Sequence, residues 1–345
     1  MRAIQLVRHG RPGTLELREV PAPQPGADEV VVRVEACGLN HLDLWLEEAG
    51  LPLNIGLPRT PGCEPAGVIA TVGSGVTAWR AGDRVAVQSN LTCGTCEYCQ
   101  AGEESMCLAA ELLGVQRDGG LAEFVAVPQR ALNRLPDGVA FTTSAALTLA
   151  GSTAMHMLTQ RATVKTGDWV LAMAGASGVG SAAIQIARGL GARVISTGST
   201  AERRSLAVGL GAEAVVDTAD PRWPAEVRRL TGKRGVDLVI EHIGGDVLPR
   251  CFECLARGGT VVTCGATAGR EVTLNLWPLF VKQQRLVGSY SRNRADLEAT
   301  LEWAAAGRLR PVIHSQRSLD HAAVSFQELR DRRVLGKALI LPHAR

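Results

Sequence analysis

The chain has 345 residues, enough for two domains that each bury a core of their own. Its net charge of +3 is small for this length and gives no reason to expect nucleic acid or an acidic membrane surface as a partner. The N-terminal segment is too short and too charged for a signal peptide, and no apolar run approaches the roughly 18 residues of a membrane span. We therefore expect a cytoplasmic protein.

Short β runs broken by turn residues fill the first part of the chain. Glycine and proline separate runs of β-forming residues, a pattern typical of a small antiparallel barrel or sandwich. The expected strands cover residues 3–7, 15–20, 29–36, 67–72 and 83–87. Two polar segments interrupt this pattern, Asn-His-Leu-Asp-Leu-Trp at 40–45 and Gly-Cys-Glu-Pro-Ala-Gly at 62–67.

Four cysteines lie close together in residues 88–110, namely Cys93, Cys96, Cys99 and Cys107. Four thiolates bind Zn²⁺ tetrahedrally and leave no position for substrate, so this spacing predicts one structural zinc per chain. A redox disulfide would need fewer cysteines. A DNA-reading zinc module is disfavoured because the segment carries acidic residues and neither lysine nor arginine.

A glycine-rich turn dominates the second part of the chain. A buried strand expected at 169–173 leads through Gly175, Gly178 and Gly180 into a helix expected at 181–190. Such a turn lets a pyrophosphate approach the helix N-terminus, which would place Ser177, Gly178, Val179 and Gly180 at the cofactor. Ser177 stands where the middle glycine of G-x-G-x-x-G belongs, so an ordinary tight turn is the alternative.

Strands and helices then alternate, which predicts a doubly wound parallel sheet. Further strands are expected at 193–197, 214–216, 237–241, 260–264 and 286–289. The second strand of the sheet ends without an acid, and Ser199, Thr200, Arg203 and Arg204 follow it, which favours NADPH over NADH. The alternative is that Glu202 binds the ribose of NADH. His242, Cys264 and Gly265 follow later strands and are expected beside the nicotinamide.

Taken in order, the two polar segments, Gly-Asp-Arg-Val at 82–85, the cysteine cluster and the glycine-rich turn resemble the medium-chain dehydrogenases/reductases. The likeness is greatest to the quinone-oxidoreductase-like branch, often labelled zinc-binding dehydrogenase. It implies a GroES-like, β-rich catalytic domain at 1–150 with a zinc lobe at 88–110, and a Rossmann cofactor domain at 151–290. Residues 291–345 would return to the catalytic domain. The resemblance also implies a small-molecule substrate and a homodimer or homotetramer.

The same resemblance places the ligands of a catalytic zinc at Asn40, Cys63 and Leu149, of which only Cys63 could ligate well. Leu42 and Trp45 occupy the positions of the proton relay in zinc alcohol dehydrogenases. We therefore expect no metal at the site of the chemistry.

Two nearby residues could be offered as substitute ligands. Cys37 is interpreted as a buried core thiol. His41 matches a position that contacts the cofactor pyrophosphate in relatives. The residues expected at the catalytic site are Asn40, Asp43 and Trp45, with Asn40 or a backbone N–H stabilising the developing oxygen.

These observations predict an NADPH-dependent reductase of a quinone or an α,β-unsaturated carbonyl compound. One alternative is a zinc alcohol dehydrogenase with atypical ligands. Another, of a different class, is an NADPH-binding structural or regulatory protein without turnover.

Overall fold

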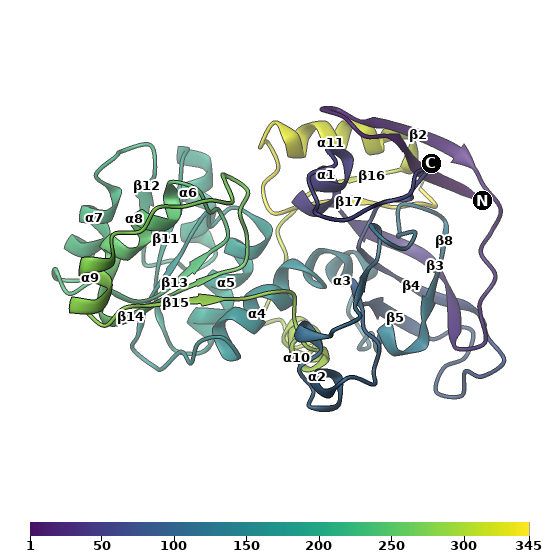
Figure 1. Cartoon of the computed structure of the whole chain (residues 1–345), viewed down its shortest axis with the longest axis horizontal. Coiled ribbons are helices and arrows are strands. Elements are labelled where there is room, and N and C mark those ends of the chain that lie inside the picture. Colours follow the sequence, from purple (N-terminus) through teal and green to yellow (C-terminus); the bar gives the residue numbers. More distant parts are fainter. Residues whose placement is uncertain (345) are drawn as a thin grey trace. The chain divides into compact units, whose positions relative to one another are not determined.

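The computed structural model describes residues 1–344 and divides them into two compact units (Figure 1). Unit 1 consists of Met1–Leu149, Asn293–Ala306 and the chain from Pro311 onward. Unit 2 consists of Ala150–Arg292 together with Gly307–Arg310. Within residues 1–344, no helix combines the length and the apolar character that crossing a membrane requires.

Unit 1 contains most of the strands. Its elements are β1 (Arg2–Arg8), β2 (Thr14–Glu19), β3 (Glu29–Gly38), α1 (His41–Glu47), β4 (Glu64–Val72), β5 (Arg84–Val87), β6 (Asn90–Leu91), α2 (Glu97–Gln100), η1 (Glu104–Met106), β7 (Glu111–Leu112), β8 (Phe124–Pro128), η2 (Gln129–Ala131), β9 (Leu132–Arg134), α3 (Phe141–Leu147), α10 (Arg294–Ala305), β16 (Ile313–Arg317), η3 (Leu319–His321), α11 (Ala322–Arg330) and β17 (Lys337–Ile340).

The main sheet of unit 1 has the order β16-β17-β3-β4-β5-β9, and β8 pairs with β3. β3 pairs with β4 over most of its ten residues, with β8 at its start and with β17 at its end. Its Val-rich sequence is buried over most of this length. The closing strand β17 pairs with the end of β3, in the register Leu339 to Gly38 and Ile340 to Cys37. This pairing brings the end of the chain to the segment that precedes α1.

Unit 2 alternates strands with helices. Its elements are α4 (Ala150–Thr159), β10 (Trp169–Ala172), α5 (Gly178–Gly189), β11 (Arg193–Gly198), α6 (Ala201–Gly209), β12 (Ala214–Asp217), α7 (Trp223–Leu230), β13 (Val236–Glu241), α8 (Val247–Cys254), β14 (Leu255–Thr263), α9 (Leu276–Val281) and β15 (Arg285–Gly288).

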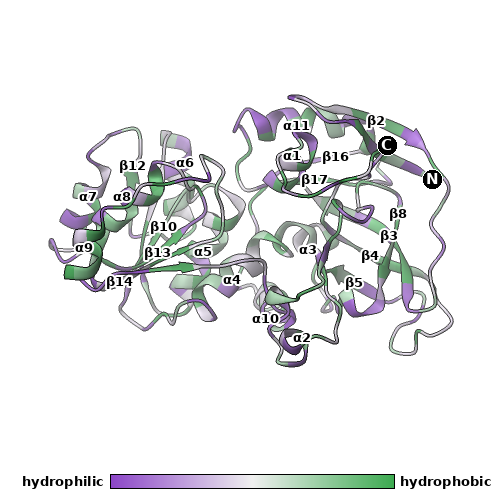
Figure 2. Cartoon of the chain, in the orientation of Figure 1, coloured by the Kyte–Doolittle hydropathy of each residue, from purple (hydrophilic) through white to green (hydrophobic). Residues whose placement is uncertain are grey.

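The sheet of unit 2 is parallel throughout and has the order β12-β11-β10-β13-β14-β15. The order reverses between β10 and β13, and such a reversal opens a crevice for a nucleotide at the carboxyl ends of the strands. Leu171, Ile195, Val239 and Val261 from four of these strands are fully buried in one core. In Figure 2 the strands of this sheet are mostly coloured as hydrophobic, as a sheet covered on both faces requires.

The observed architecture is a GroES-like unit plus a Rossmann-type unit, so the predicted fold class is confirmed. The helices α3 and α4, at the passage from unit 1 to unit 2, are separated at residues 148–149. Neither β16 nor α11 is among the elements expected from the sequence.

Candidate active site

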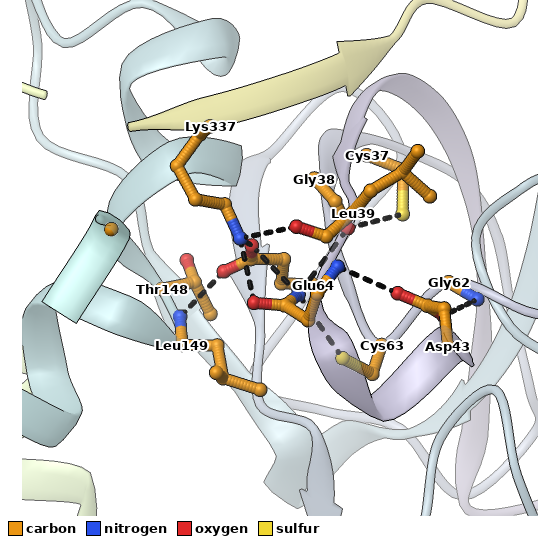
Figure 3. Close-up of polar contacts among 12 residues, drawn as sticks. Cys37, Gly38, Leu39, Asp43, Gly62, Cys63, Glu64, Thr148, Leu149 and Lys337 are labelled. Carbon is orange, nitrogen blue, oxygen red and sulfur yellow. Dashed lines mark hydrogen bonds and ion pairs between the residues drawn. The ribbon is translucent and has the colours of Figure 1, made fainter. Parts of the chain in front are cut away.

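A buried carboxylate, Glu64 at the start of β4, holds together parts of unit 1 that are far apart in the sequence (Figure 3). Its Oε1 accepts from Asn40 Nδ2 at 3.0 Å, and its Oε2 accepts from the backbone N–H of Leu149 at 2.6 Å. The ammonium of Lys337, from β17, forms an ion pair with the same carboxylate. Since Glu64 is fully buried, these partners replace the water that its charge would otherwise need.

Asp43 holds two backbone segments beside Glu64, one at Asn40 and one at Gly62. Its carboxylate accepts from the backbone N–H of Asn40 at 2.8 Å and from that of Gly62 at 3.0 Å, so Asn40 and Asp43 form the capping box of α1. Burial raises the pKa of Asp43 to about 6, although both backbone bonds favour the charged form. Both oxygens bond to the main chain, which gives Asp43 a positioning role within unit 1.

The turn at Gly62 has little room for any other residue. Gly62 has a φ of +97°, and a Cβ there would lie 2.8 Å from the sulfur of Cys37 and from a backbone nitrogen. Glycine therefore sets the direction in which Cys63 and Glu64 leave the turn.

The three positions at which relatives place catalytic zinc ligands do come together here. The Cys63 sulfur lies 3.5 Å from Asn40 Nδ2, and Leu149 contacts Glu64 through its backbone. Burial raises the pKa of the Cys63 thiol well above its usual range, and the negative charges of Asp43 and Glu64 raise it further. The three positions that the family resemblance aligns with zinc ligands thus lie near one another. Their side chains, however, offer few metal ligands.

Other expected residues of the region lie on or beside α1. Trp45 is half-buried in this helix. His41 is exposed at its first turn, and partial desolvation with the charges of Arg332 and Lys337 lowers the pKa of its imidazole. Cys37 is fully buried in the main core of unit 1, which confirms its interpretation as a core thiol.

The sulfur atoms of Cys93, Cys96, Cys99 and Cys107 all lie within 4.8 Å of one another. Cys93 Sγ is 3.9 Å from that of Cys99 and 3.6 Å from that of Cys107. Tetrahedral zinc with bonds of about 2.3 Å separates its sulfurs by about 3.8 Å, so the cluster fits this ion. Backbone N–H groups of Thr95 and Cys96 lower the pKa of Cys93 to about 6, whereas burial raises the pKa of Cys99 to about 12. The fit to zinc therefore rests on the spacing of the sulfurs.

In unit 2, the glycine-rich turn leads directly into the N-terminus of α5. Ser177 caps this helix, accepting from the backbone N–H of Gly180 at 3.0 Å. A Cβ at Gly180 would lie 2.2 Å from a backbone oxygen of the turn, at Ala174, so strand and helix can approach this closely only with glycine. Gly178 and Val179 form the first turn of α5, where unpaired N–H groups suit a pyrophosphate.

The ends of β13 and β14 lie beside this turn. His242 Nε2 is 3.0 Å from the hydroxyl of Ser177, and a Cβ at Gly265 would lie 2.5 Å from the oxygen of His242. Glu241 is fully buried and accepts from the backbone N–H of Gly244 at 2.7 Å, which fixes the loop after β13. Cys264 follows β14, and burial raises the pKa of its thiol to about 12.

The residues expected to choose between NADPH and NADH gather at the end of β11. Thr200 caps α6, and Arg203 Nη1 lies 3.4 Å from Ser199 Oγ. Arg204 Nη1 donates to the oxygen of Gly198 at 3.2 Å and pairs with Asp217 Oδ2 at 2.7 Å. Arg204 therefore already has a carboxylate partner, Asp217, at the end of the neighbouring strand β12.

The contacts of Lys337 and Asp217 were not expected from the sequence. Lys337 could have been noticed as one charge in the apolar strand Lys-Ala-Leu-Ile, since a charge in such a strand often has a buried partner. Asp217 ends a short strand of the parallel sheet, where ligand-contacting residues gather.

Comparison with known proteins gives a consistent result. Residues 26–137 match the alcohol dehydrogenase GroES-like domain, and residues 178–306 match the zinc-binding dehydrogenase domain. An alcohol dehydrogenase of Geobacillus stearothermophilus is 31% identical over 88% of this chain and 89% of its own. The crystal structure of an NAD-dependent alcohol dehydrogenase has 38% identity and a TM-score of 0.95, covering 99% of both chains. A zinc-binding dehydrogenase of Sinorhizobium meliloti 1021, solved bound to NADP, has 29% identity and a TM-score of 0.87, covering 99% of both chains.

A GroES-like unit joined to a Rossmann-type unit defines a class of NAD(P)-dependent oxidoreductases, and this protein is such an enzyme. The chain belongs to the medium-chain dehydrogenase/reductase superfamily, among its zinc-binding, alcohol dehydrogenase-like members.

Proposed function

We propose that this enzyme uses NADPH to reduce a quinone or an α,β-unsaturated carbonyl compound, without a metal at the site of the chemistry. The observation that carries the proposal is the Lys337 ammonium on Glu64, beside Asn40 and Cys63. A metal ion that took Glu64 as a ligand would have to displace an ammonium already paired with this carboxylate. The remaining side chains at the ligand positions offer one thiol, an amide and an aliphatic group, which do not supply the three ligands of an open catalytic zinc site.

The proposed reaction is a two-electron reduction. NADPH, when bound, supplies a hydride, and the acceptor takes this hydride and one proton from solvent while NADP⁺ is released. Asn40 is the residue proposed to donate an N–H to the acceptor oxygen as negative charge develops on it. Asp43 holds the backbone of Asn40 in place through the capping box.

Arg203 and Arg204 support the choice of NADPH because guanidinium groups suit a 2′-phosphate. The neighbour from Sinorhizobium meliloti that was solved with NADP is in accord with this choice. The rival choice is NADH, which the name of the NAD-dependent neighbour favours.

We also propose a single zinc per chain, held by Cys93, Cys96, Cys99 and Cys107 in a purely structural role. The spacing of the four sulfurs supports this assignment. With four protein ligands the ion would have no open position, so its contribution would be to fold the lobe.

The test combines metal analysis with turnover. Protein stripped of loosely bound metal is analysed for zinc and then assayed for NADPH oxidation with a panel of quinones and enones. One zinc per chain, turnover with a panel member and loss of turnover in Asn40→Ala support the proposal. Binding of NADPH without turnover on a broad panel would indicate the structural or regulatory alternative.

The second candidate is a zinc alcohol dehydrogenase, which the names of the relatives favour. It predicts two zincs per chain and oxidation of alcohols that a chelator abolishes. That result would overturn the metal-free proposal.

A further inference from the structure

The ammonium of Lys337 has all of its hydrogen-bonding capacity used inside unit 1. Only 5% of its side chain is exposed, and it donates to the oxygen of Leu39 at 2.8 Å and to Asn40 Oδ1 at 2.6 Å. Its third partner is the carboxylate of Glu64 (Figure 3). An ammonium has three N–H groups, so none is left to donate to a substrate.

The amide of Asn40 lies between two opposite charges. Its Oδ1 faces the Lys337 ammonium, and its Nδ2 donates to Glu64 Oε1 at 3.0 Å. Reversing the amide would turn its NH₂ group toward the ammonium, so the chemistry of the partners fixes its orientation. The other contacts of Nδ2 are long, 3.4 Å to the oxygen of Gly38 and 3.5 Å to the sulfur of Cys63.

We propose that Lys337 is a positioning residue for catalysis, whose ammonium orients and polarises the amide of Asn40. The positive charge of the Lys337 ammonium, which faces Asn40 Oδ1, draws electron density toward this oxygen. The N–H groups of the amide thereby become stronger hydrogen-bond donors. One N–H is held by Glu64, and the weakly engaged one is the donor for the acceptor oxygen. This inference rests on the proposed function, in which Asn40 binds that oxygen.

A purely structural role for Lys337 makes a different prediction. If the ammonium only neutralises the buried carboxylate, removing both charges together would remove the need for it. The informative comparison is therefore between Glu64→Gln and the double variant Glu64→Gln/Lys337→Met. Neither contains the carboxylate, so the two differ only in the side chain at position 337, and the comparison is repeated at about pH 6 to favour the ammonium in Glu64→Gln.

The first measurement is kcat and KM of both variants with the acceptor that the unsubstituted enzyme reduces fastest. We expect kcat to be on the order of tenfold lower in the double variant, with the KM for NADPH changed less than about twofold. Glu64→Gln/Lys337→Arg keeps the charge and should recover part of the loss. Lys165→Met, at an exposed lysine, controls for loss of a lysine as such. Equal kcat values in Glu64→Gln and the double variant, both folded by circular dichroism, would overturn the proposal.

The second measurement does not depend on turnover. Protein labelled with ¹⁵N-asparagine gives a side-chain amide signal for Asn40, which Asn40→Ala identifies by its loss. We expect this signal to move upfield between Glu64→Gln and the double variant, and to be unchanged by Lys165→Met. An unmoved signal refutes polarisation by Lys337. A moved signal in an enzyme that reduces no acceptor supports the positioning and refutes the proposed function.

Discussion

Replacing Arg204 with glutamine is expected to weaken the binding of NADPH and to leave the binding of NADH almost unchanged. A guanidinium that bonds to a phosphate contributes about 1.5–3 kcal/mol, which corresponds to a roughly 10- to 150-fold increase in Kd when it is lost. Asp217 already pairs with this guanidinium at 2.7 Å, with 29% of the arginine and 40% of the aspartate side chain exposed. Exposed pairs of this kind contribute at most about 1 kcal/mol, so the phosphate can compete for the arginine.

The same geometry predicts the opposite effect for Asp217→Asn. Removing the competing carboxylate should tighten the binding of NADPH by up to about fivefold. Both dissociation constants can be measured by fluorescence titration at about 0.15 M salt, where long-range charge effects are screened. Arg193→Gln, which breaks the pair with Glu213 near the other end of β11, is the control and should change neither constant. Equal weakening of NADPH and NADH by Arg204→Gln, or weaker NADPH binding by Asp217→Asn, would contradict the assignment.

Three further substitutions test the lobe, the capping box and the turn. Cys107→Ser should lower the zinc content below one per chain and speed proteolysis between residues 93 and 107, because three thiolates hold the ion less firmly; unchanged zinc would exclude this cysteine as a ligand. The raised pKa of Asp43 means that its contribution to the free energy of unfolding is present below its ordinary value of 3.8 and is lost as the pH rises through about 6. The stability difference between the unsubstituted protein and Asp43→Asn should therefore change by up to about 3 kcal/mol between about pH 4 and about pH 8, as followed by urea unfolding, and a constant difference would refute the shift. Gly180→Ala should abolish cofactor binding because its Cβ would lie 2.2 Å from a backbone oxygen, whereas Gly209→Ala meets nothing within 4 Å and should bind normally.

Local patterns predicted much of the fold. The strand, glycine-rich turn and helix at residues 169–190 are contiguous, so their signals reinforce one another within one short window. The four cysteines could likewise be grouped because all of them lie in one loop. The family resemblance placed Asn40, Cys63 and Leu149 in one site, and the structure brings them together around Glu64.

The contacts that the sequence did not reveal join distant segments. Lys337 and Asn40 are 297 positions apart, and their contact depends on how β17 pairs with the end of β3. A strand of four residues has no internal pattern that fixes its partner or its register. Asp217 meets Arg204 for a similar reason, because two parallel strands align their carboxyl ends.

The long separation in sequence between Lys337 and Asn40, 297 positions, affects how the protein can fold during synthesis. The strand of Lys337, β17, lies between β16 and β3, so the sheet of unit 1 lacks an inner strand until residues 337–340 have left the ribosome. Until then the Glu64 carboxylate lacks its ion-pair partner Lys337, and burying this charge without a partner would be unfavourable. Most of unit 2 is one continuous segment and can fold first, although it is made second. A premature stop just before β17 should therefore leave a folded Rossmann-type unit. The sheet of the GroES-like unit would lack the strand that joins β16 to β3.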